Sequence, residues 1–391
     1  MLEEESNGQF AYLMLTTSEK DALLEKLLQI MFGFGILEPL LNDPTIKEIM
    51  INGPKRIFIE RDGRPEPARD KQGQLLNFHD RAELTHVIEK IVSPINRKVD
   101  ETDPIVDARL PDGSRVNIVV KPIALDGPAV TIRKFPQHPY TLEQLVSFGA
   151  LPLEAADILS KLVQAKYNLF ISGGTGSGKT TFLNSLSMKI PAYERLVTVE
   201  DAAELKLVQA ENIVRLETRP PNIEGKGSIS MRELVRTALR MRPDRIIVGE
   251  VRGGEALDML QAMNTGHDGS LSTGHANSAQ DLLGRLETMV LMAGLDLPVA
   301  AIRGQIVSAV DIIIHLARFR DGKRRVAHIT EIVGLEKTEI ITRNLFVFKE
   351  EGIDTLGNIQ GKLLLVQELI HHEKFLMAGI SVPELFSRTR R

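Results

Sequence analysis

The sequence predicts an α/β protein in which a small α+β domain precedes a larger domain built on a parallel sheet. From about residue 50 to 135, short β-rich runs are separated by Asp-Gly pairs. Such pairs favour hairpins because both turn residues tolerate positive φ. Beyond residue 140, apolar strand-like runs alternate with helix-like segments, which is typical of a parallel sheet covered by helices. A chain of 391 residues has room for two or three domains.

The composition excludes several classes of protein. The chain is 43% hydrophobic and 26% charged, as expected of a globular protein rather than a disordered, collagen-like or membrane-spanning one. Cysteine is absent, which excludes disulfides, a thiolate nucleophile and cysteine-ligated zinc. A net charge of −4, no tryptophan and 5% aromatic residues argue against a protein built mainly to bind nucleic acid.

The start of the chain does not look like an export signal. It reads Met1-Leu2-Glu3-Glu4-Glu5, without the basic start and apolar run of a secretory signal, and no apolar run is long enough to span a membrane. We therefore expect a cytoplasmic chain that is peripheral to a membrane only through partners. We also expect a flexible tail over residues 1–17, followed by a helix because leucines recur at helical spacing from Leu23 to Met31.

The N-terminal domain is predicted to span residues 18–140. Two hairpins are expected, one at Asp62-Gly63 and one at Asp112-Gly113, each beside a run rich in β-branched residues. Apolar residues at helical spacing over 82–92 predict one helix among these strands. The polar, proline-bearing stretch 135–140 is predicted to be the linker to the next domain.

The C-terminal domain is predicted to span residues 141–391. Its expected parallel strands are 168–172, 196–200, 245–250 and 269–273. A further hairpin around Asp321-Gly322 is expected as a peripheral addition to this sheet. The last 40 residues show helical apolar spacing and end in arginines, and we assign them no chemistry.

A glycine-rich loop follows the first of these strands and matches the pattern G-x-x-x-x-G-K-[ST]. Its glycines let successive backbone N–H groups turn toward a phosphate, and the helix that follows adds a positive dipole. Lysine at this spacing reaches the β- and γ-phosphates, and the Thr180 hydroxyl binds Mg²⁺. We therefore predict a site for ATP and Mg²⁺ formed by Gly173, Gly174, Thr175, Gly176, Ser177, Gly178, Lys179, Thr180 and Thr181.

Hydrolysis also needs a carboxylate at the end of a neighbouring strand. Glu250 ends one apolar run, and Glu200 and Asp201 end another, so both runs carry acids to the phosphate edge of the sheet. The usual second motif has aspartate before its glutamate, but here Gly249 takes that position. Mg²⁺ would then depend on Thr180, the phosphates and water, and Glu250 would orient the attacking water. Either acid could instead be a helix N-cap or a surface residue.

Histidine and arginine complete the candidate site. His275 follows a predicted strand, where it could donate a hydrogen bond to the γ-phosphate, and its spacing from other histidines does not fit a metal site. Arg109, Arg115 and Arg133 each look like a solvated charge when taken alone. A motor, however, needs guanidinium groups from a moving domain or a neighbour to neutralise transition-state charge.

These segments together resemble the secretion ATPase superfamily, and in particular the CpaF/TadA-type ATPases of the tight-adherence (Flp) pilus. Beside the Walker A loop, the resemblance rests on the family's acidic, atypical Walker B and histidine boxes and on three N-terminal segments. These are residues 37–41, 107–110, 131–135, 200–205, 239–244, 249–252 and 265–278.

The resemblance implies more than the residues do by themselves. It implies a RecA-like C-terminal ATPase domain in a homo-hexamer, with nucleotide between the two domains of each subunit. Glu250 would be the catalytic acid, Glu200 an auxiliary acid, and the three arginines would face the nucleotide. The motor would power assembly of a pilus, with retraction left open, against inner-membrane platform proteins.

Several alternatives stay open. The closest is a type IV secretion traffic ATPase. A nucleic-acid motor of the same fold is disfavoured by the charge and the missing tryptophan. A GTP-dependent switch would need an N-K-x-D motif, which Asn96-Arg97-Lys98-Val99-Asp100 breaks by one extra residue. A nucleotide-binding scaffold without hydrolysis would require Glu250 to be idle.

Overall fold

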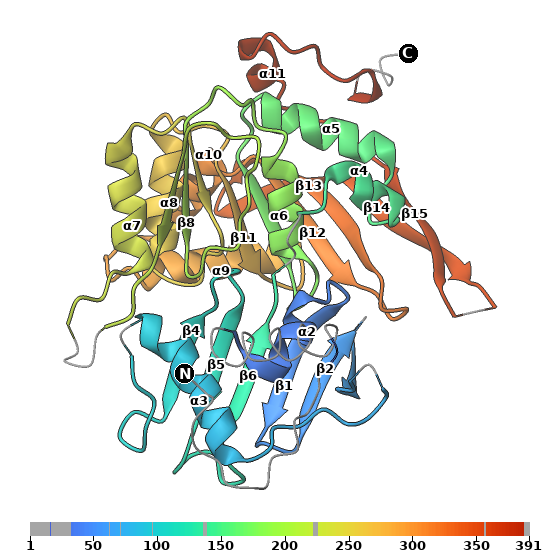
Figure 1. Cartoon of the computed structure of the whole chain (residues 1–391). Coiled ribbons are helices and arrows are strands. Elements are labelled where there is room, and N and C mark those ends of the chain that lie inside the picture. The colour runs from blue at the N-terminus through green and yellow to red at the C-terminus, as the bar shows by residue number, and fades with distance from the viewer. Residues whose placement is uncertain are drawn as a thin grey trace, which may run out of the picture. The chain divides into compact units, whose positions relative to one another are not determined.

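The computed structural model describes residue 16 and residues 33–386, apart from 62, 71, 96, 136–138, 222–225 and 356. The tail expected over residues 1–17, except Thr16, and the helix expected over 18–31 lie outside the described residues, as do the C-terminal arginines. The chain divides into two compact units, Met1–Gln137 and His138–Arg391. Figure 1 shows both units and labels many of their elements.

The first unit contains a six-stranded antiparallel sheet in the order β3-β2-β1-β6-β5-β4. The strands are β1 (Ile46–Asn52), β2 (Ile57–Arg61), β3 (Arg64–Pro67), β4 (Ile105–Arg109), β5 (Arg115–Val119) and β6 (Ala129–Arg133). Short helices lie at Gly35–Leu37 (η1), Glu38–Asn42 (α2) and Ser93–Ile95 (η2). The hairpin predicted at Asp112-Gly113 is confirmed as the connection between β4 and β5.

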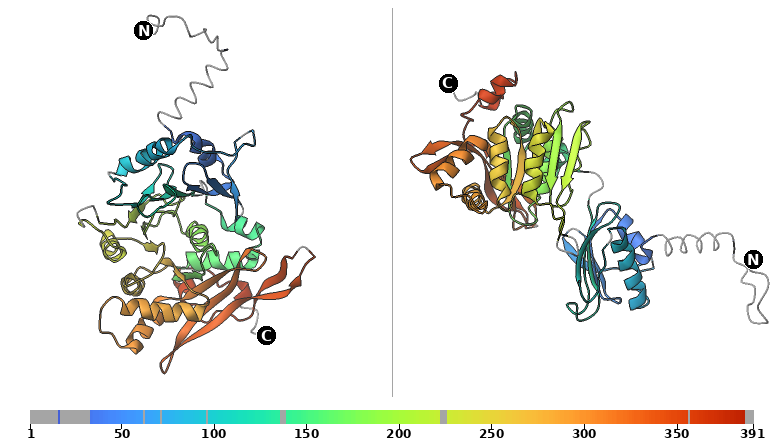
Figure 2. Two further views of the ribbon diagram at one scale, coloured as in Figure 1. Left: turned by 90° about the horizontal axis from the view of Figure 1, so that it is seen from below. Right: turned by 90° about the vertical axis from the view of Figure 1, so that its left-hand side faces the viewer.

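Helix α3 (Arg81–Val92) covers one face of this sheet, as Figure 2 shows. It begins at Asp80, whose side chain accepts a hydrogen bond from the Glu83 N–H, and it confirms the helix predicted over 82–92. Its apolar stripe, including Leu84 and Ile88, is buried with alternate residues of the strands, such as Ile49. Since strand side chains alternate, the other face of the sheet carries the polar residues.

The second unit is built on a nine-stranded sheet in the order β15-β14-β13-β12-β7-β11-β10-β8-β9. The six strands β12, β7, β11, β10, β8 and β9 pair in parallel. Strands β13, β14 and β15 add to the β12 edge in antiparallel pairs. The bounds are β7 (Leu169–Gly173), β8 (Leu196–Glu200), β9 (Ile213–Glu217), β10 (Arg245–Val248), β11 (Leu271–His275), β12 (Ile312–Arg318), β13 (Arg324–Glu336), β14 (Glu339–Ile353) and β15 (Ile359–Leu365).

The four parallel strands predicted from the sequence are β7, β8, β10 and β11. The expectation that the next hairpin is peripheral is wrong, because β12 pairs in parallel with β7 in the middle of the sheet. The run Ile312-Ile313-Ile314 is fully buried, as a strand covered on both faces must be. Strand β10 ends at Val248, so Glu250 lies in the loop just beyond it.

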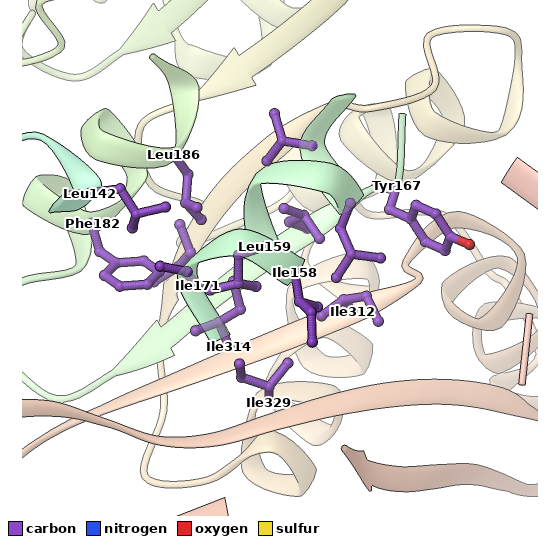
Figure 3. Packing of buried hydrophobic residues seen from close by; sticks show 14 of the residues in the cluster. Leu142, Ile158, Leu159, Tyr167, Ile171, Phe182, Leu186, Ile312, Ile314 and Ile329 are labelled. Carbon is purple, nitrogen blue, oxygen red and sulfur yellow. The ribbon is translucent and has the colours of Figure 1, made fainter. Parts of the chain in front are cut away.

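Helices cover both faces of this sheet. Helices α4 (Leu142–Ser147), α5 (Leu153–Gln164) and α6 (Lys179–Ser187) pack on one face, in the cluster of Figure 3. Helices α7 (Met231–Ala238), α8 (Glu255–Asn264), α9 (Ala279–Leu291) and α10 (Val299–Ala309) pack on the other, and the turn η3 (Leu239–Met241) follows α7. Along β7, Leu169 and Ile171 point into the first cluster and Phe170 into the second.

The helical expectation for the last 40 residues is wrong over most of their length. Where the structure describes them, they hold the end of β14, all of β15, and only the short helices α11 (Glu373–Met377) and η4 (Glu384–Phe386). The segment after β15 is held by tertiary contacts instead. The Tyr167 hydroxyl donates to the His371 carbonyl at 2.6 Å, and the Glu331 carboxylate accepts from the N–H groups of Ile370 and His371.

Within the part of the chain that the structure describes, no helix is both long and apolar enough to cross a membrane.

Candidate functional site

The glycine-rich loop connects β7 to α6 at the carboxyl edge of the parallel strands (Figure 1). Gly173 ends the strand, and a Cβ built there would lie 2.5 Å from the carbonyl oxygen of Leu316, so no larger residue fits. Gly178 precedes Lys179 with a φ of +97°, a conformation that favours glycine. The loop is therefore shaped by steric limits that only glycine meets, on a strand buried throughout its length.

Three donors of this loop converge on the carbonyl oxygen of Gly174. The Ser177 hydroxyl lies 2.9 Å away, Lys179 Nζ 3.1 Å and the Ser177 backbone nitrogen 3.3 Å. One acceptor oxygen therefore gathers a hydroxyl, an ammonium and an amide. A phosphate oxygen offers the same donors a stronger, charged acceptor. This arrangement fits the diphosphate group of a nucleotide.

Lys179, His275 and Glu250 form one chain of polar contacts beside the loop. Lys179 Nζ lies 3.2 Å from His275 Nδ1, and His275 Nε2 lies 2.8 Å from Glu250 Oε1. Burial is the main cause that lowers the pKa of His275, and Lys179 adds to it against the opposing charge of Glu250. Burial also lowers the pKa of Lys179. A neutral imidazole can accept from the Lys179 ammonium, so the three side chains are compatible as placed.

Arg252 is a site residue to which we assigned no role from the sequence. Its Nη2 and Nε donate to Glu250 Oε2 at 2.6 and 3.0 Å, and its Nη1 lies 3.6 Å from Asp201 Oδ2. Arg252 thus joins the two acidic strand ends that were predicted separately. The sequence signal that could have indicated Arg252 is its position two residues after Glu250, an acid at a predicted strand end.

Glu200 and Gly249 are packed against each other. Glu200 is 2% exposed, and its Oε2 accepts from the N–H groups of Glu204 and Leu205 at 2.7 and 3.0 Å. Burial raises the pKa of Glu200, which the two backbone N–H groups oppose. A Cβ on Gly249 would lie 3.1 Å from Glu200 Cγ. The side chain of Glu200 therefore fills the space that the aspartate of the usual motif would need.

Thr180 and Thr181 lie half-buried in the first turn of α6, directly after Lys179. A hydroxyl at this position is a hard oxygen donor, which suits Mg²⁺. The loop thus offers an N–H, an O–H and an ammonium group that converge on one point, which fits the nucleotide. The threonine hydroxyl that follows them fits the metal ion.

The three predicted arginines lie in the first unit as one row across neighbouring strands. Arg109 of β4 pairs with Arg115 of β5, which in turn pairs with Arg133 of β6. Residues directly opposite each other point to the same face, here the face away from α3. Arg133 Nε lies 3.6 Å from Glu48 Oε1 of β1, and the Arg115 guanidinium lies 5.9 Å from the Phe135 ring centroid.

Comparison with known proteins shows the family of this chain. Residues 32–377 match the type II/IV secretion system protein family. A Mycobacterium tuberculosis protein named for conjugal transfer is 37% identical over 322 residues, covering 81% of this chain and 89% of the relative. The type IV secretion system protein PtlH homolog of Bordetella bronchiseptica is 35% identical over 335 residues, covering 79% and 97%. The crystal structure of the pilus retraction motor PilT with ADP has a TM-score of 0.55 at 18% identity, covering 93% and 88%.

The chain belongs to the type II/IV secretion system protein family. The resemblance to secretion ATPases is confirmed at this level, whereas the CpaF/TadA type stays a prediction. The predicted α/β fold class, with an α+β domain before an ATPase-type domain, is confirmed by the two sheets and by the likeness to PilT.

Proposed function

We propose that this protein is a motor that hydrolyses ATP. The observation that carries the proposal is the continuous set of contacts from the loop to an acid. Lys179 contacts both the Gly174 carbonyl, at 3.1 Å, and His275, and His275 contacts Glu250. A phosphate bound by Lys179 would therefore be connected to the Glu250 carboxylate through the His275 side chain. That is the arrangement phosphoryl transfer to water requires.

Each residue of this set has a proposed task. Lys179 exchanges the Gly174 carbonyl for a phosphate oxygen, and the loop N–H groups bind the same phosphates. Glu250 orients the attacking water. Arg252 donates to its Oε2, and His275 Nε2 lies 2.8 Å from its Oε1. Glu200 is the proposed auxiliary acid, and its carboxylate also holds the loop after β8 by accepting from the Glu204 N–H. Thr180 would hold Mg²⁺, which when bound neutralises phosphate charge.

Replacement of Glu250 tests this proposal. In Glu250→Gln the shape of the site is kept, so nucleotide affinity should stay within about threefold while turnover falls by about a hundredfold or more. Glu211→Gln, an exposed glutamate of the same unit, is the matched control and should keep normal turnover. Near-normal hydrolysis by Glu250→Gln would contradict the assignment of Glu250. A wild-type protein that binds ATP without turnover would favour the scaffold alternative.

We also propose that Arg109, Arg115 and Arg133 act on the phosphates, from the same chain or from a neighbour in a ring. The three guanidinium groups lie in register on adjacent strands and point to one face of the sheet, so an anion at that face could contact all three. ATP would draw the arginines toward its γ-phosphate and hydrolysis would release them, so that the domains 18–140 and 141–391 move relative to each other.

The arginine proposal has its own test. Arg133→Ala should weaken hydrolysis more than it weakens ADP binding. The reason is that negative charge develops around the γ-phosphoryl group in the transition state, and ADP lacks that group. Arg56→Ala, at an exposed arginine that directly precedes β2 and is paired with Asp126, is the control. An equal loss of hydrolysis and ADP binding in Arg133→Ala would indicate a structural role instead.

The machine that this motor drives is proposed from the boxes of the sequence and from the relatives. We favour a cytoplasmic homo-hexamer of the CpaF/TadA type that powers assembly of a type IV or Flp pilus through inner-membrane platform proteins, because the sequence carries the boxes of that type. A type IV secretion traffic ATPase is the second candidate, and the relatives named for conjugal transfer and type IV secretion favour it.

Two measurements separate these assignments. The mass in solution with and without nucleotide should reach six times that of one chain. ATP turnover should then rise on adding the platform proteins of a pilus machine. Stimulation by components of a type IV secretion channel alone would favour the second candidate, and stimulation by DNA a nucleic-acid motor. A comparison of ATP with GTP turnover tests the switch alternative.

A further inference from the structure

Arg324 reaches the phosphate-binding loop from a distant part of the chain. It is the first residue of β13, 148 positions after Gly176, and its Nε donates to the Gly176 carbonyl at 2.8 Å. Its aliphatic stem lies beside the next part of the loop, with Cδ 3.6 Å from where a Cβ on Gly178 would be. Arg324 therefore crosses the loop in the middle of its glycine-rich turn, although it belongs to none of the motifs found in the sequence.

The hydrogen bond constrains one particular peptide group. In a trans peptide the C=O of one residue and the N–H of the next point in opposite directions. With the Gly176 carbonyl turned toward Arg324, the N–H of Ser177 must point to the other side. There it donates to the Gly174 carbonyl at 3.3 Å, the oxygen that Ser177 Oγ and Lys179 Nζ also contact.

The Gly176–Ser177 peptide is held from within the loop by the hydrogen bond of the Ser177 N–H to the Gly174 carbonyl, at 3.3 Å. Gly176 has a φ of +71° and no side chain, and nothing lies within 4 Å of where its Cβ would be. Glycine reaches both signs of φ at similar cost, so a side chain does not restrict this turn. The charge-assisted hydrogen bond from the Arg324 guanidinium is a second constraint on the same peptide, at about twice the strength of a neutral one.

We infer that Arg324 is a positioning residue for nucleotide binding: it holds the Gly176–Ser177 peptide so that the Ser177 N–H faces the bound phosphates. The inference rests on the proposed function, since it concerns the ligand of the same loop. The Ser177 N–H would contact a phosphate that ADP and ATP share. Loss of Arg324 therefore weakens both nucleotides alike and raises KM for ATP, with a much smaller effect on kcat.

Arg324→Met is the variant of choice, because methionine keeps most of the stem beside Gly178 and removes the donor and the charge. Arg318→Met is its matched control. Arg318 is the register partner of Arg324 on β12, an exposed arginine at the same end of the hairpin, and it makes no hydrogen bond to the loop in the described part of the chain. Arg324→Lys restores a donor and the charge without the guanidinium.

The experiment is an equilibrium titration of the full chain with a fluorescent ADP analogue, together with steady-state ATP turnover. Arg324→Met should bind ADP about tenfold more weakly, as expected for the loss of one charge-assisted hydrogen bond. KM for ATP should rise about as much, with kcat within about threefold of the wild type. Arg324→Lys should recover most of the affinity, and Arg318→Met should stay within about twofold of the wild type.

The outcomes are distinguishable. If Arg324→Met and Arg318→Met bind ADP equally well, or if lysine recovers nothing, the inference is overturned while the proposed function stands. If Arg324→Met lowers kcat and the nucleotide-free thermal midpoint together, Arg324 is merely structural and the inference also fails. If the wild-type protein binds no nucleotide, the proposed function itself has failed.

Discussion

The buried ion pair between Arg245 and Glu194 gives the sharpest stability prediction. Arg245 is 0% exposed and opens β10, the strand that leads to Glu250, and Glu194 is 3% exposed just before β8. The pair is bidentate, with Nε–Oε2 and Nη2–Oε1 distances of 2.6 and 2.9 Å. Arg245 Nη1 also donates to the Val163 carbonyl at 2.5 Å.

Arg245→Met removes the cation and leaves the Glu194 carboxylate buried without its partner. Breaking one side of a buried pair costs about 3–5 kcal/mol, because the remaining charge has lost both water and its counter-ion. A domain of this size loses about 2–4 °C of thermal midpoint for each kcal/mol, so we expect a fall of about 10 °C. The measurement is thermal unfolding of the full chain followed by circular dichroism.

Two further variants make the prediction specific. Arg245→Met with Glu194→Leu replaces the pair by apolar groups and should recover part of the loss. Recovery stays incomplete because the Val163 carbonyl has still lost its donor. Lys161→Met breaks the exposed pair with Asp157 on α5 and should cost less than about 0.5 kcal/mol. A fall of under about 3 °C for Arg245→Met, or a double variant no more stable than the single, would refute this reasoning.

Three further predictions follow from the site and its surroundings. Gly249→Ala should lower stability by about 1–3 kcal/mol and reduce turnover, because its Cβ would displace Glu200. Its control is Gly284→Ala, in helix α9 with nothing within 4 Å of the new Cβ, which should be neutral or stabilising by up to about 1 kcal/mol in the same unfolding assay. Arg252→Ala should lower kcat by about tenfold or more, because Glu250 loses the donors that orient it, while ADP affinity changes little; equal losses of both would contradict this role. The last prediction concerns pH. Burial lowers the pKa of His315 and of His328, and His315 Nδ1 lies 3.1 Å from the Ser172 hydroxyl beside the loop. The unfolded chain therefore takes up more protons than the folded one as pH falls below about 6.5, so stability present above that pH is lost below it. His315→Asn should flatten the dependence of the thermal midpoint on pH, whereas His79→Asn, at an exposed histidine, should not.

Elements that depend on neighbouring residues were predictable from the sequence. Helix α3, the hairpin at Asp112-Gly113 and the four parallel strands follow from the spacing of apolar residues and from turn chemistry. The same holds for the loop, because a phosphate-binding turn needs its glycines, lysine and threonine within eight consecutive positions. Strand ends also predicted that Glu250 and His275 each lie at the carboxyl edge of the parallel strands, and the structure shows that the two side chains contact each other there.

Elements that depend on pairing between distant segments were not predictable. The run of isoleucines in β12 fits a peripheral hairpin or a central strand equally well, and only the parallel register with β7 decides between them. The alternation in β15 is too short to exclude a helix until β14 pairs with it. Likewise, nothing near Glu200 in the sequence indicates that Gly249 leaves it the space it fills.

The sequence by itself therefore determined the fold class and the glycine-rich turn between a strand and a helix, because both follow from patterns of residues within a few positions of one another. Only the tertiary structure decided which side chains hold them. Arg252 beside Asp201, the row of arginines across three strands and Arg324 on the Gly176 carbonyl all depend on sheet order and register. Such contacts join groups that lie on or beside different strands. Strand pairing sets which of these groups face each other, so the contacts form only once the sheet has formed.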